Sequence, residues 1–251
     1  MKIAVPEHLL LGFTLEEKLR HAKMIGADGV EFAADGLTAR VPQVAEALAK
    51  VGLQAAAVDA GFTRLVHPDY AERDRAIARL RQAMADSLDL GSGTVVFLSH
   101  FQTEPCLPDL SPYKSAVELE AEMLVKQLRA TLTDLAYAMG AELVLLPVRQ
   151  QKAHLVNRLG QAARIRAGTD DHPHLWVGAD LDDVLHEEAD PLEAAREYAP
   201  MLRYVRLNGV INHSGLLAAL MERGYDGWLS LTDGEVDVVR RWLPTLEDAA
   251  P

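Results

Sequence analysis

Cysteine and positive charge are both scarce in this chain of 251 residues. Cys106 is the single cysteine, so neither an intramolecular disulfide nor a cluster of several thiolates can form, and we expect a structural thiol. The 25 Lys and Arg residues face 37 Asp and Glu residues, and the formal net charge is −12. Nucleic acid is therefore not an expected partner, because binding to phosphates needs clustered cations. Small anions stay open as ligands, since a few local cations can dominate a pocket.

Long apolar runs are also missing. Pro6, Glu7 and His8 interrupt the N-terminal apolar run before the core of a signal peptide could form. No segment approaches the roughly 20 apolar residues of a membrane helix, so we expect a cytoplasmic protein without a membrane partner. The composition, 49% hydrophobic, 25% charged and 6% aromatic, is typical of a globular enzyme. Its length fits one domain over residues 1–251.

What the chain does contain is a regular alternation of short apolar runs with longer amphipathic stretches. Eight strands are predicted at residues 2–6, 29–32, 54–59, 94–99, 142–147, 175–180, 202–207 and 228–232. The helices between them include one opened by a Thr14–Glu17 capping box and closed by Gly26, and long ones over residues 69–90 and 118–139. Eight such units predict a single-domain α/β fold, the (β/α)8 TIM barrel. The loop at residues 103–113 is interpreted either as a lid over the barrel mouth or as a plain connection.

Three segments of the sequence resemble the xylose isomerase-like family, which includes sugar isomerases, sugar epimerases and abasic-site endonucleases. Residues 15–31 resemble its first helix and second strand, which end in a glutamate, here Glu31. Residues 70–100 resemble its third helix and fourth strand, and residues 209–231 resemble its closing segment with a Gly-Tyr-Asp-Gly-Trp turn. The resemblance implies a TIM barrel with its active site at the carboxyl ends of the strands, the face that barrel enzymes use in general.

The resemblance also implies one divalent ion, Mn²⁺, Mg²⁺ or Zn²⁺, held at the ends of strands five to eight. Among the matching positions, Asp180 retains a ligand, whereas Pro147, Arg206 and Thr232 stand where the family has a glutamate, a histidine and a glutamate. Affinity for such an ion needs several converging donors, so we expect no tightly bound metal and no other cofactor. Should a metal bind despite this, Asp180, Asp233 and Glu235 are its expected ligands.

Polar residues at strand ends are the remaining candidates for the site. Glu31, His100 and Asp180 are predicted as acid/base residues, and Arg206 as a clamp for an anion or an oxyanion. Asn208, Glu7, His8 and Asp183 are predicted to contact substrate. Structural roles stay open for the same residues. Glu31 could hold a loop in place through backbone amides, and His100 could be a hydrogen-bonded structural histidine. Asp180 and Arg206 could form a purely structural ion pair. His154, His172, His174 and His186 lack the spacing of a metal site and are expected to be solvated.

The expected function is that of a sugar or polyol-derivative isomerase or epimerase that moves a proton next to a carbonyl, without the family's usual metal. The alternative is a sugar- or anion-binding barrel that has lost turnover. The expected partner is a small sugar-like molecule, and a homo-oligomer is left open. An abasic-site endonuclease is disfavoured, because the chain has neither its many metal ligands nor a basic surface.

Overall fold

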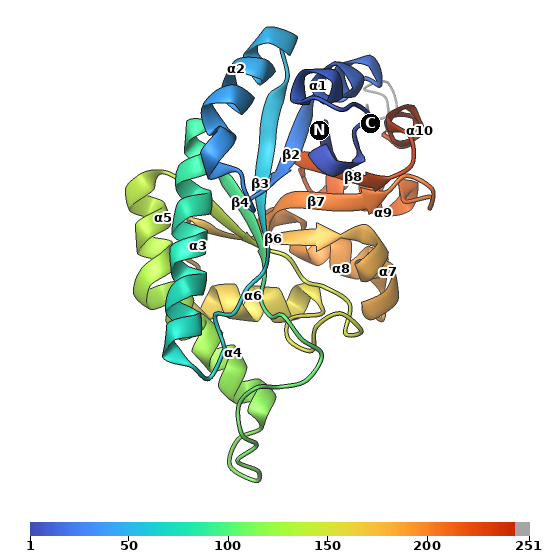
Figure 1. The fold of residues 1–251 in the computed structure, drawn as a ribbon. Helices are drawn as coiled ribbons and strands as arrows, with labels where there is room; N and C mark the ends of the chain where they lie inside the picture. The colour runs from blue at the N-terminus through green and yellow to red at the C-terminus, as the bar shows by residue number, and fades with distance from the viewer. Residues whose placement is uncertain (244–251) are drawn as a thin grey trace.

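A closed barrel of eight parallel strands forms the centre of the computed structural model, which describes residues 1–243 (Figure 1). Neighbouring strands pair in sequence order, and β8 pairs with β1 to close the barrel. The strands are β1 Lys2–Pro6, β2 Gly29–Ala33, β3 Gln54–Phe62, β4 Thr94–Leu98, β5 Glu142–Leu145, β6 Leu175–Asp180, β7 Leu202–Asn208 and β8 Trp228–Asp233. All eight predicted strands are thus confirmed, with boundaries that differ by at most three residues.

Helices surround the barrel and cover its outer face (Figure 1). They are α1 Leu15–Met24, α2 Val41–Val51, α3 Tyr70–Asp89, α4 Ala116–Gln127, α5 Thr133–Met139, α6 Leu159–Gly168, α7 Leu181–Glu187, α8 Pro191–Tyr198, α9 Ser214–Glu222 and α10 Val236–Trp242, with short helical turns η1 Glu7–Leu9, η2 Thr38–Arg40, η3 Leu128–Leu132 and η4 Ala199–Met201. None of the helices in residues 1–243 is both long and apolar enough to span a membrane.

The residues predicted to begin and end the first helix do so in α1. Thr14 and Glu17 form the predicted capping box of α1, and Gly26 follows that helix with a positive φ of 81°. The predicted helix over residues 118–139 is instead interrupted, because a π-helical turn, η3, separates α4 from α5. A π-helical turn inserts an extra residue into the hydrogen-bond ladder, and the apolar periodicity of the sequence does not reveal it.

Two apolar cores hold this architecture together. The larger core lies between strands and helices and includes Leu19, Leu80, Leu124 and Leu217. The smaller core fills the barrel interior with mostly small or branched side chains, and Tyr204 is its largest fully buried member. Trp176 and Trp228 pack against this interior core. At Gly178 an added Cβ would lie 2.9 Å from the Leu146 Cδ1 atom and 3.2 Å from the Tyr204 carbonyl oxygen, so a larger residue would force neighbouring atoms to shift.

The loop between β4 and α4 extends away from the barrel, at the bottom of the view in Figure 1. Leu110 and Lys114 form a small antiparallel bridge within it, and the Tyr113 side chain is 92% exposed. In this conformation the outer part of the loop does not cover the barrel mouth, which favours the plain connection over the lid.

Candidate active site at the barrel mouth

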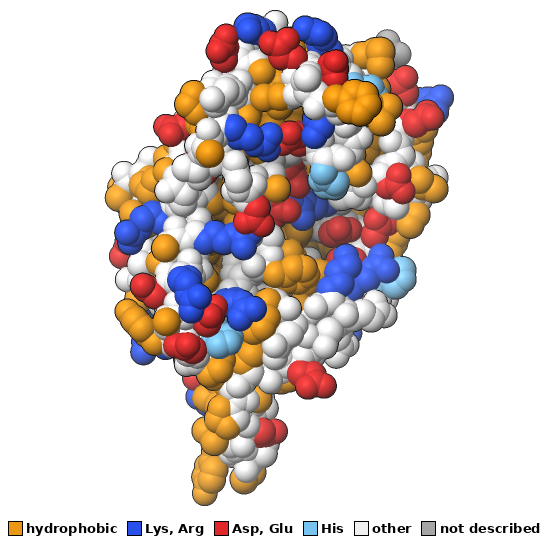
Figure 2. Space-filling model, viewed as in Figure 1, with side chains coloured by type: hydrophobic (Ala, Val, Ile, Leu, Met, Phe, Trp, Pro, Cys, Tyr) orange, Lys and Arg blue, Asp and Glu red, His pale blue; other side chains and the backbone are white. Residues whose placement is uncertain are grey.

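Charged side chains gather in a hollow near the centre of the face seen in Figure 2. A central charged group at the barrel mouth is Arg206 on β7, whose side chain is only 11% exposed. Its Nη2 atom lies 2.7 Å from Oε1 of Glu31 on β2 and 2.8 Å from Oδ2 of Asp59 on β3. These two strands lie across the barrel from β7, so the guanidinium bridges the mouth. The alternative in which Arg206 pairs only with Asp180 is wrong, since its ion-pair partners within residues 1–243 are Glu31 and Asp59.

Four donor groups hold the Glu31 carboxylate. Arg206 donates through Nε and Nη2, and the hydroxyl groups of Tyr204 and Ser230 each donate to Oε2 at 2.7 Å. Tyr204, Arg206 and Ser230 come from β7 and β8, and alternation along these strands directs them into the barrel. Burial and the neighbouring Glu31 charge raise the pKa of Tyr204 well above its ordinary value, so Tyr204 remains a donor.

The Arg206 guanidinium stays charged in this environment. Burial alone would lower the pKa of Arg206, but the charges of Glu31 and Asp59 raise it above its ordinary value. Two carboxylates surround one cation, so the cluster of Glu31, Asp59 and Arg206 carries a formal charge of about −1. Asp59 was not identified from the sequence as a site residue, although its position as the last residue of the predicted third strand was an available signal.

Asp180 lies at the end of β6, next to Arg206 in the strand ladder. Its Oδ1 accepts the amides of Asp182 and Asp183 and thereby caps α7, whereas no residue in 1–243 donates a hydrogen bond to Oδ2. Burial, followed by the nearby Asp183 and Asp182 charges, raises the pKa of Asp180 from 3.8 to about 6. A carboxyl group of this pKa can exchange protons near neutral pH.

The other predicted substrate-contacting residues are engaged locally. Glu7 pairs with Arg40 and with Lys18, and the hydrogen bond from Arg40 holds the pKa of Glu7 below its ordinary value despite burial. Asp183 is buried and pairs with Arg149. The Asn208 Oδ1 atom accepts the Val210 amide at 2.8 Å.

His8 is exposed on η1, directly after β1. No contact joins it to the cluster of Glu31, Asp59 and Arg206 among the hydrogen bonds and ion pairs of residues 1–243.

His100 does not join this cluster, although it follows β4. Its fully buried ring contacts Glu120 of α4, with 3.5 Å between His100 Nε2 and Glu120 Oε2. His154, from the loop after β5, also contacts Glu120 and is 6% exposed. The expectation of a solvated His154 is therefore wrong, because its carboxylate partner lies 34 residues away on a helix. The Cys106 Sγ atom lies 3.8 Å from His100 Nε2.

Three of the residues that the resemblance places at metal positions offer no free donor atom in the described structure. Pro147 has no donor side chain, Arg206 is a cation, and the Thr232 hydroxyl donates to the Leu207 carbonyl at 3.1 Å. Asp233 and Glu235 are exposed, and Asp233 accepts the Gly234 amide. Within residues 1–243, His100, Cys106 and Glu120 are the one group of three metal-donor side chains whose ligand atoms lie within 4.8 Å of one another.

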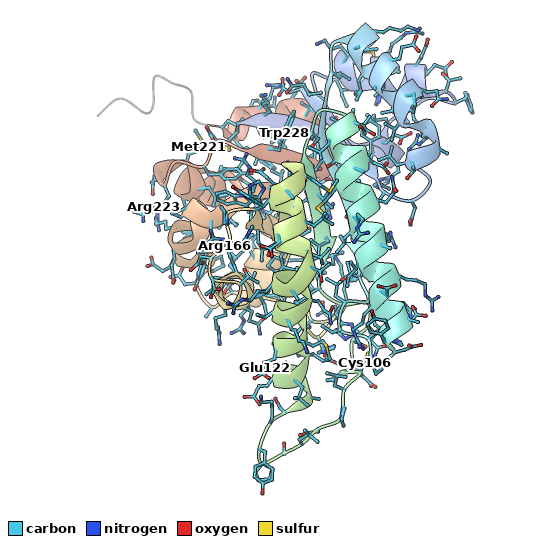
Figure 3. The ribbon with its side chains drawn as sticks, turned by 90° about the vertical axis from the view of Figure 1, so that its left-hand side faces the viewer. Cys106, Glu122, Arg166, Met221, Arg223 and Trp228 are labelled. Carbon is cyan, nitrogen blue, oxygen red and sulfur yellow. The ribbon has the colours of Figure 1, made fainter. Side chains whose placement is uncertain are left out.

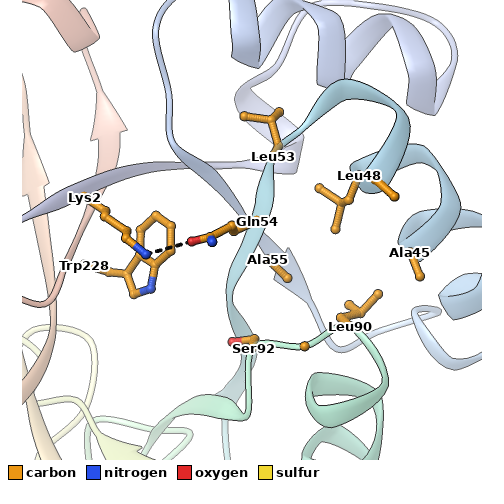
Figure 4. Close-up of a pocket in the computed structure, with 11 residues that line it drawn as sticks. Lys2, Ala45, Leu48, Leu53, Gln54, Ala55, Leu90, Ser92 and Trp228 are labelled. Atoms are coloured by element: carbon orange, nitrogen blue, oxygen red, sulfur yellow. Dashed lines mark hydrogen bonds between the residues drawn. The ribbon is translucent and has the colours of Figure 1, made fainter.

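A surface cavity of about 490 Å³ lies at the opposite, amino-terminal end of the strands (Figure 4). Lys2, Gln54 and Trp228 line it, and the Lys2 ammonium donates to Gln54 Oε1 at 2.9 Å. TIM-barrel enzymes perform their chemistry at the carboxyl ends of the strands, so the barrel mouth remains the candidate active site.

Comparison with known proteins agrees with the fold. The chain is 25% identical over 242 residues to the 3-dehydro-D-guloside 4-epimerase of Escherichia coli (strain K12), covering 91% of this chain and 90% of that relative. The apo structure of a 3-keto-D-glucoside 4-epimerase from E. coli matches with a TM-score of 0.82, 19% identity and 96% coverage of both chains. A D-allulose 3-epimerase from Methylomonas sp., solved in complex with D-allulose, matches with a TM-score of 0.74, 16% identity and coverage of 99% and 92%.

A family model described as the xylose isomerase-like TIM barrel matches residues 19–244, most of the chain. The sequence resemblance and the closed eight-stranded barrel are both explained by this match. The chain belongs to the xylose isomerase-like TIM barrel family.

Proposed function

We propose that this protein is a carbohydrate epimerase or isomerase that moves a proton on a carbon next to a carbonyl group, without a metal ion at the barrel mouth. The observation that carries the proposal is the placement of Asp180, with its pKa of about 6, beside the permanently charged Arg206 at the ends of β6 and β7. A proton acceptor and a fixed cation are the two groups that enolisation of a sugar requires. The epimerase names of the relatives support this class of substrate.

In the proposed reaction the ionised Asp180 removes the proton from the carbon beside the carbonyl. The C–H electron pair moves to form the carbon–carbon double bond of an enediolate, and the negative charge develops on the former carbonyl oxygen. Arg206 stabilises this oxyanion, while Glu31 and Asp59 hold the guanidinium in place. Delivery of a proton from water to the other face of the same carbon gives the epimer, and Asp180 then releases its own proton to solvent. For the isomer, Asp180 returns its proton to the neighbouring carbon, while the hydroxyl group on the first carbon loses its proton to become the new carbonyl and the former carbonyl oxygen takes up a proton from water.

In this proposal Glu31 is a positioning residue rather than the base, because its oxygens already accept four hydrogen bonds. A carboxylate must give up such bonds before it can take a proton from substrate. His100 is likewise not assigned an acid/base role, because its ring is fully buried against Glu120. Arg206 keeps the predicted oxyanion role, whereas its two carboxylate partners disfavour a general anion clamp.

The proposal is tested by exchange of substrate protons with D₂O, followed by NMR after dialysis of the protein against a chelator. The probes are D-fructose, D-allulose, L-ribulose and a methyl 3-keto-D-glucoside. We expect wild-type protein to exchange at least one of them and Asp180→Asn to lose at least a hundred-fold in rate, since general-base catalysis contributes about 10²–10⁴. Asp226→Asn, a carboxylate change at the opposite end of the barrel, is the matched control. Equal rates for wild type and Asp180→Asn would contradict the proposal.

One observation favours the alternative of a binding barrel without turnover. The charged and hydroxyl groups at the bottom of the mouth already form hydrogen bonds and ion pairs with one another. The side chains of Glu31 and Arg206 are only 6% and 11% exposed. Such a floor could support a bound polyol without reacting with it. Calorimetric binding of any of the four probes without deuterium exchange would favour this alternative.

A further inference from the structure

The cluster of His100, Cys106, Glu120 and His154 joins three segments that are distant in the sequence. His100 and Cys106 belong to the segment after β4, Glu120 belongs to α4, and His154 belongs to the loop after β5. Figure 3 shows Cys106 near the N-terminal part of α4. Glu120 and His100 are fully buried, His154 is nearly so, and Cys106 is partly exposed. Nothing in the proposed reaction uses these four side chains, which we call the rim cluster.

The hydrogen bonds of His154 place a ring nitrogen that would otherwise be an acceptor against the Glu120 carboxylate. His154 Nδ1 lies 3.2 Å from the Gln102 carbonyl oxygen, which can only accept, so Nδ1 carries a proton. In the neutral ring the Nε2 atom is then an acceptor, and it faces Glu120 Oε2, which also accepts. Two acceptors in contact require either a second proton on the ring or a metal ion between them. A histidine whose Nδ1–H is fixed by a backbone carbonyl is the usual form of a metal ligand.

His100 has the opposite arrangement of its ring nitrogens. Its Nδ1 accepts the Phe101 amide at 2.7 Å and the Gln102 amide at 3.3 Å, so the ring proton resides on Nε2. That Nε2–H points toward Cys106 Sγ at 3.8 Å and Glu120 Oε2 at 3.5 Å. His100 is therefore placed as a donor to a ligand atom rather than as a ligand. Donors of this kind stabilise the thiolate of a metal-bound cysteine.

We propose that Cys106 Sγ, Glu120 Oε2 and His154 Nε2 bind a Zn²⁺ ion, with His100 as a hydrogen-bond donor to this set. A sulfur, a nitrogen and a carboxylate oxygen form a donor set that selects Zn²⁺ over Mg²⁺ or Mn²⁺. One thiolate and one carboxylate also neutralise the two charges of the ion. The partly exposed thiol provides the access route and leaves room for a fourth, water ligand.

Two pairs within the proposed donor set, Cys106 with Glu120 and Glu120 with His154, already lie near each other. Tetrahedral zinc with bonds of about 2.3 Å to sulfur and about 2.0 Å to nitrogen or oxygen separates its ligand atoms by about 3.3–3.5 Å. The Cys106 sulfur and a Glu120 carboxylate oxygen already lie within 4.8 Å of each other. Glu120 is the donor common to both pairs, because its carboxylate also contacts His154, so closing the set needs Cys106, on its partly exposed loop, to move toward the His154 ring. This site lies between the segments that follow β4 and β5, and it includes none of the residues that the resemblance places at metal positions.

The test uses Co²⁺ as a spectroscopic substitute for Zn²⁺ in the full chain. We expect protein dialysed against a chelator to bind one Co²⁺ per chain with a near-ultraviolet thiolate-to-cobalt charge-transfer band that Zn²⁺ then bleaches. Because Cys106 is the only cysteine, this band reports that residue alone. Cys106→Ser should abolish the band, and His154→Gln should weaken Co²⁺ binding at least ten-fold.

Two controls separate the rim cluster from other sites. His172→Gln alters a surface histidine beside His174 and should leave Co²⁺ affinity unchanged. Asp180→Asn, at the barrel mouth, should also leave it unchanged. Circular dichroism confirms that each variant is folded. Folded wild-type protein that binds no Co²⁺, binds it without the charge-transfer band, or loses it with Asp180→Asn would overturn the zinc site and leave a buried His154–Glu120 ion pair. Failure of the proton-exchange assay would not affect this result.

Discussion

The barrel mouth and the rim cluster both bury carboxylates, but they balance the charge in different ways. At the mouth, the fixed cation Arg206 contacts both Glu31 and Asp59, so the protein itself compensates one of their two negative charges. In the rim cluster, Glu120 faces two imidazoles and lies near a thiol, and none of these three neighbours carries a permanent positive charge. The comparison teaches that one barrel buries a carboxylate beside a fixed cation in one place and beside imidazoles and a thiol in another, so we expect the two sites to respond differently to an added metal ion.

Removing Arg206 should have the largest effect. Arg206→Ala leaves Glu31 and Asp59 buried without their cation, and we expect it to lower the free energy of unfolding by about 3–5 kcal/mol. Urea denaturation measures this change, with Arg81→Ala on the exposed face of α3 as the control. Adding Glu31→Gln and Asp59→Asn should restore part of the loss. If Arg206→Ala is as stable as Arg81→Ala, the Arg206 cation is not needed to stabilise the buried carboxylates of Glu31 and Asp59.

The pH dependence of stability should identify Asp180 as the ionisable group of the mouth. Its pKa is raised from 3.8 to about 6, so the folded state holds a proton that the unfolded state has released between these values. The free energy of unfolding therefore falls as pH rises through this window, by at most about 3 kcal/mol from Asp180. Asp180→Asn should remove this part of the pH dependence in urea titrations at pH 4 and pH 8. An unchanged slope would show that Asp180 titrates normally.

A smaller effect is expected from Glu120→Gln in the metal-depleted rim cluster. Glutamine keeps one carbonyl oxygen for the Cys106 and Leu107 amides but loses the charge that faces His154, so we expect a loss of about 2 kcal/mol. Thermal melting in the presence of a chelator measures it. Saturating Zn²⁺ should widen the gap between wild type and variant, because a ligand that binds only the folded state stabilises it. If Zn²⁺ does not change the stability difference between wild type and Glu120→Gln, the ion does not bind at the rim cluster.

The outer part of the loop between β4 and α4 should contribute least to stability. Tyr113 is 92% exposed, and its replacement by alanine should change the free energy of unfolding by less than about 0.5 kcal/mol. Measured beside Glu120→Gln, Tyr113→Ala shows whether the loop is held at its buried base or along its whole length. A loss of 2 kcal/mol would mean that Tyr113 is covered in solution.

The order of strands and helices could be predicted because each strand is a short apolar run and each helix an amphipathic stretch. The contacts at the barrel mouth could not be predicted from the sequence, because Arg206 and its partner Glu31 are 175 residues apart. That Arg206 pairs with Glu31 and not with Asp180 depends on the geometry of the closed barrel. His154 was misjudged for a similar reason: its partner Glu120 lies in a helix whose polar positions are otherwise expected to face water. The interruption of this helix at η3 also has no simple sequence signal.

The central claim, that proton transfer at the mouth depends on Arg206 and Asp180 rather than on a metal, is tested most directly by the metal dependence of substrate exchange. The measurement is the rate of deuterium incorporation from D₂O into whichever of the four sugar probes reacts, in chelator-treated wild-type protein with and without added Mn²⁺. We predict equal rates in both conditions and a loss of at least a hundred-fold in Asp180→Asn. Exchange that appears only after Mn²⁺ is added would contradict the account and restore a metal ion to the mouth.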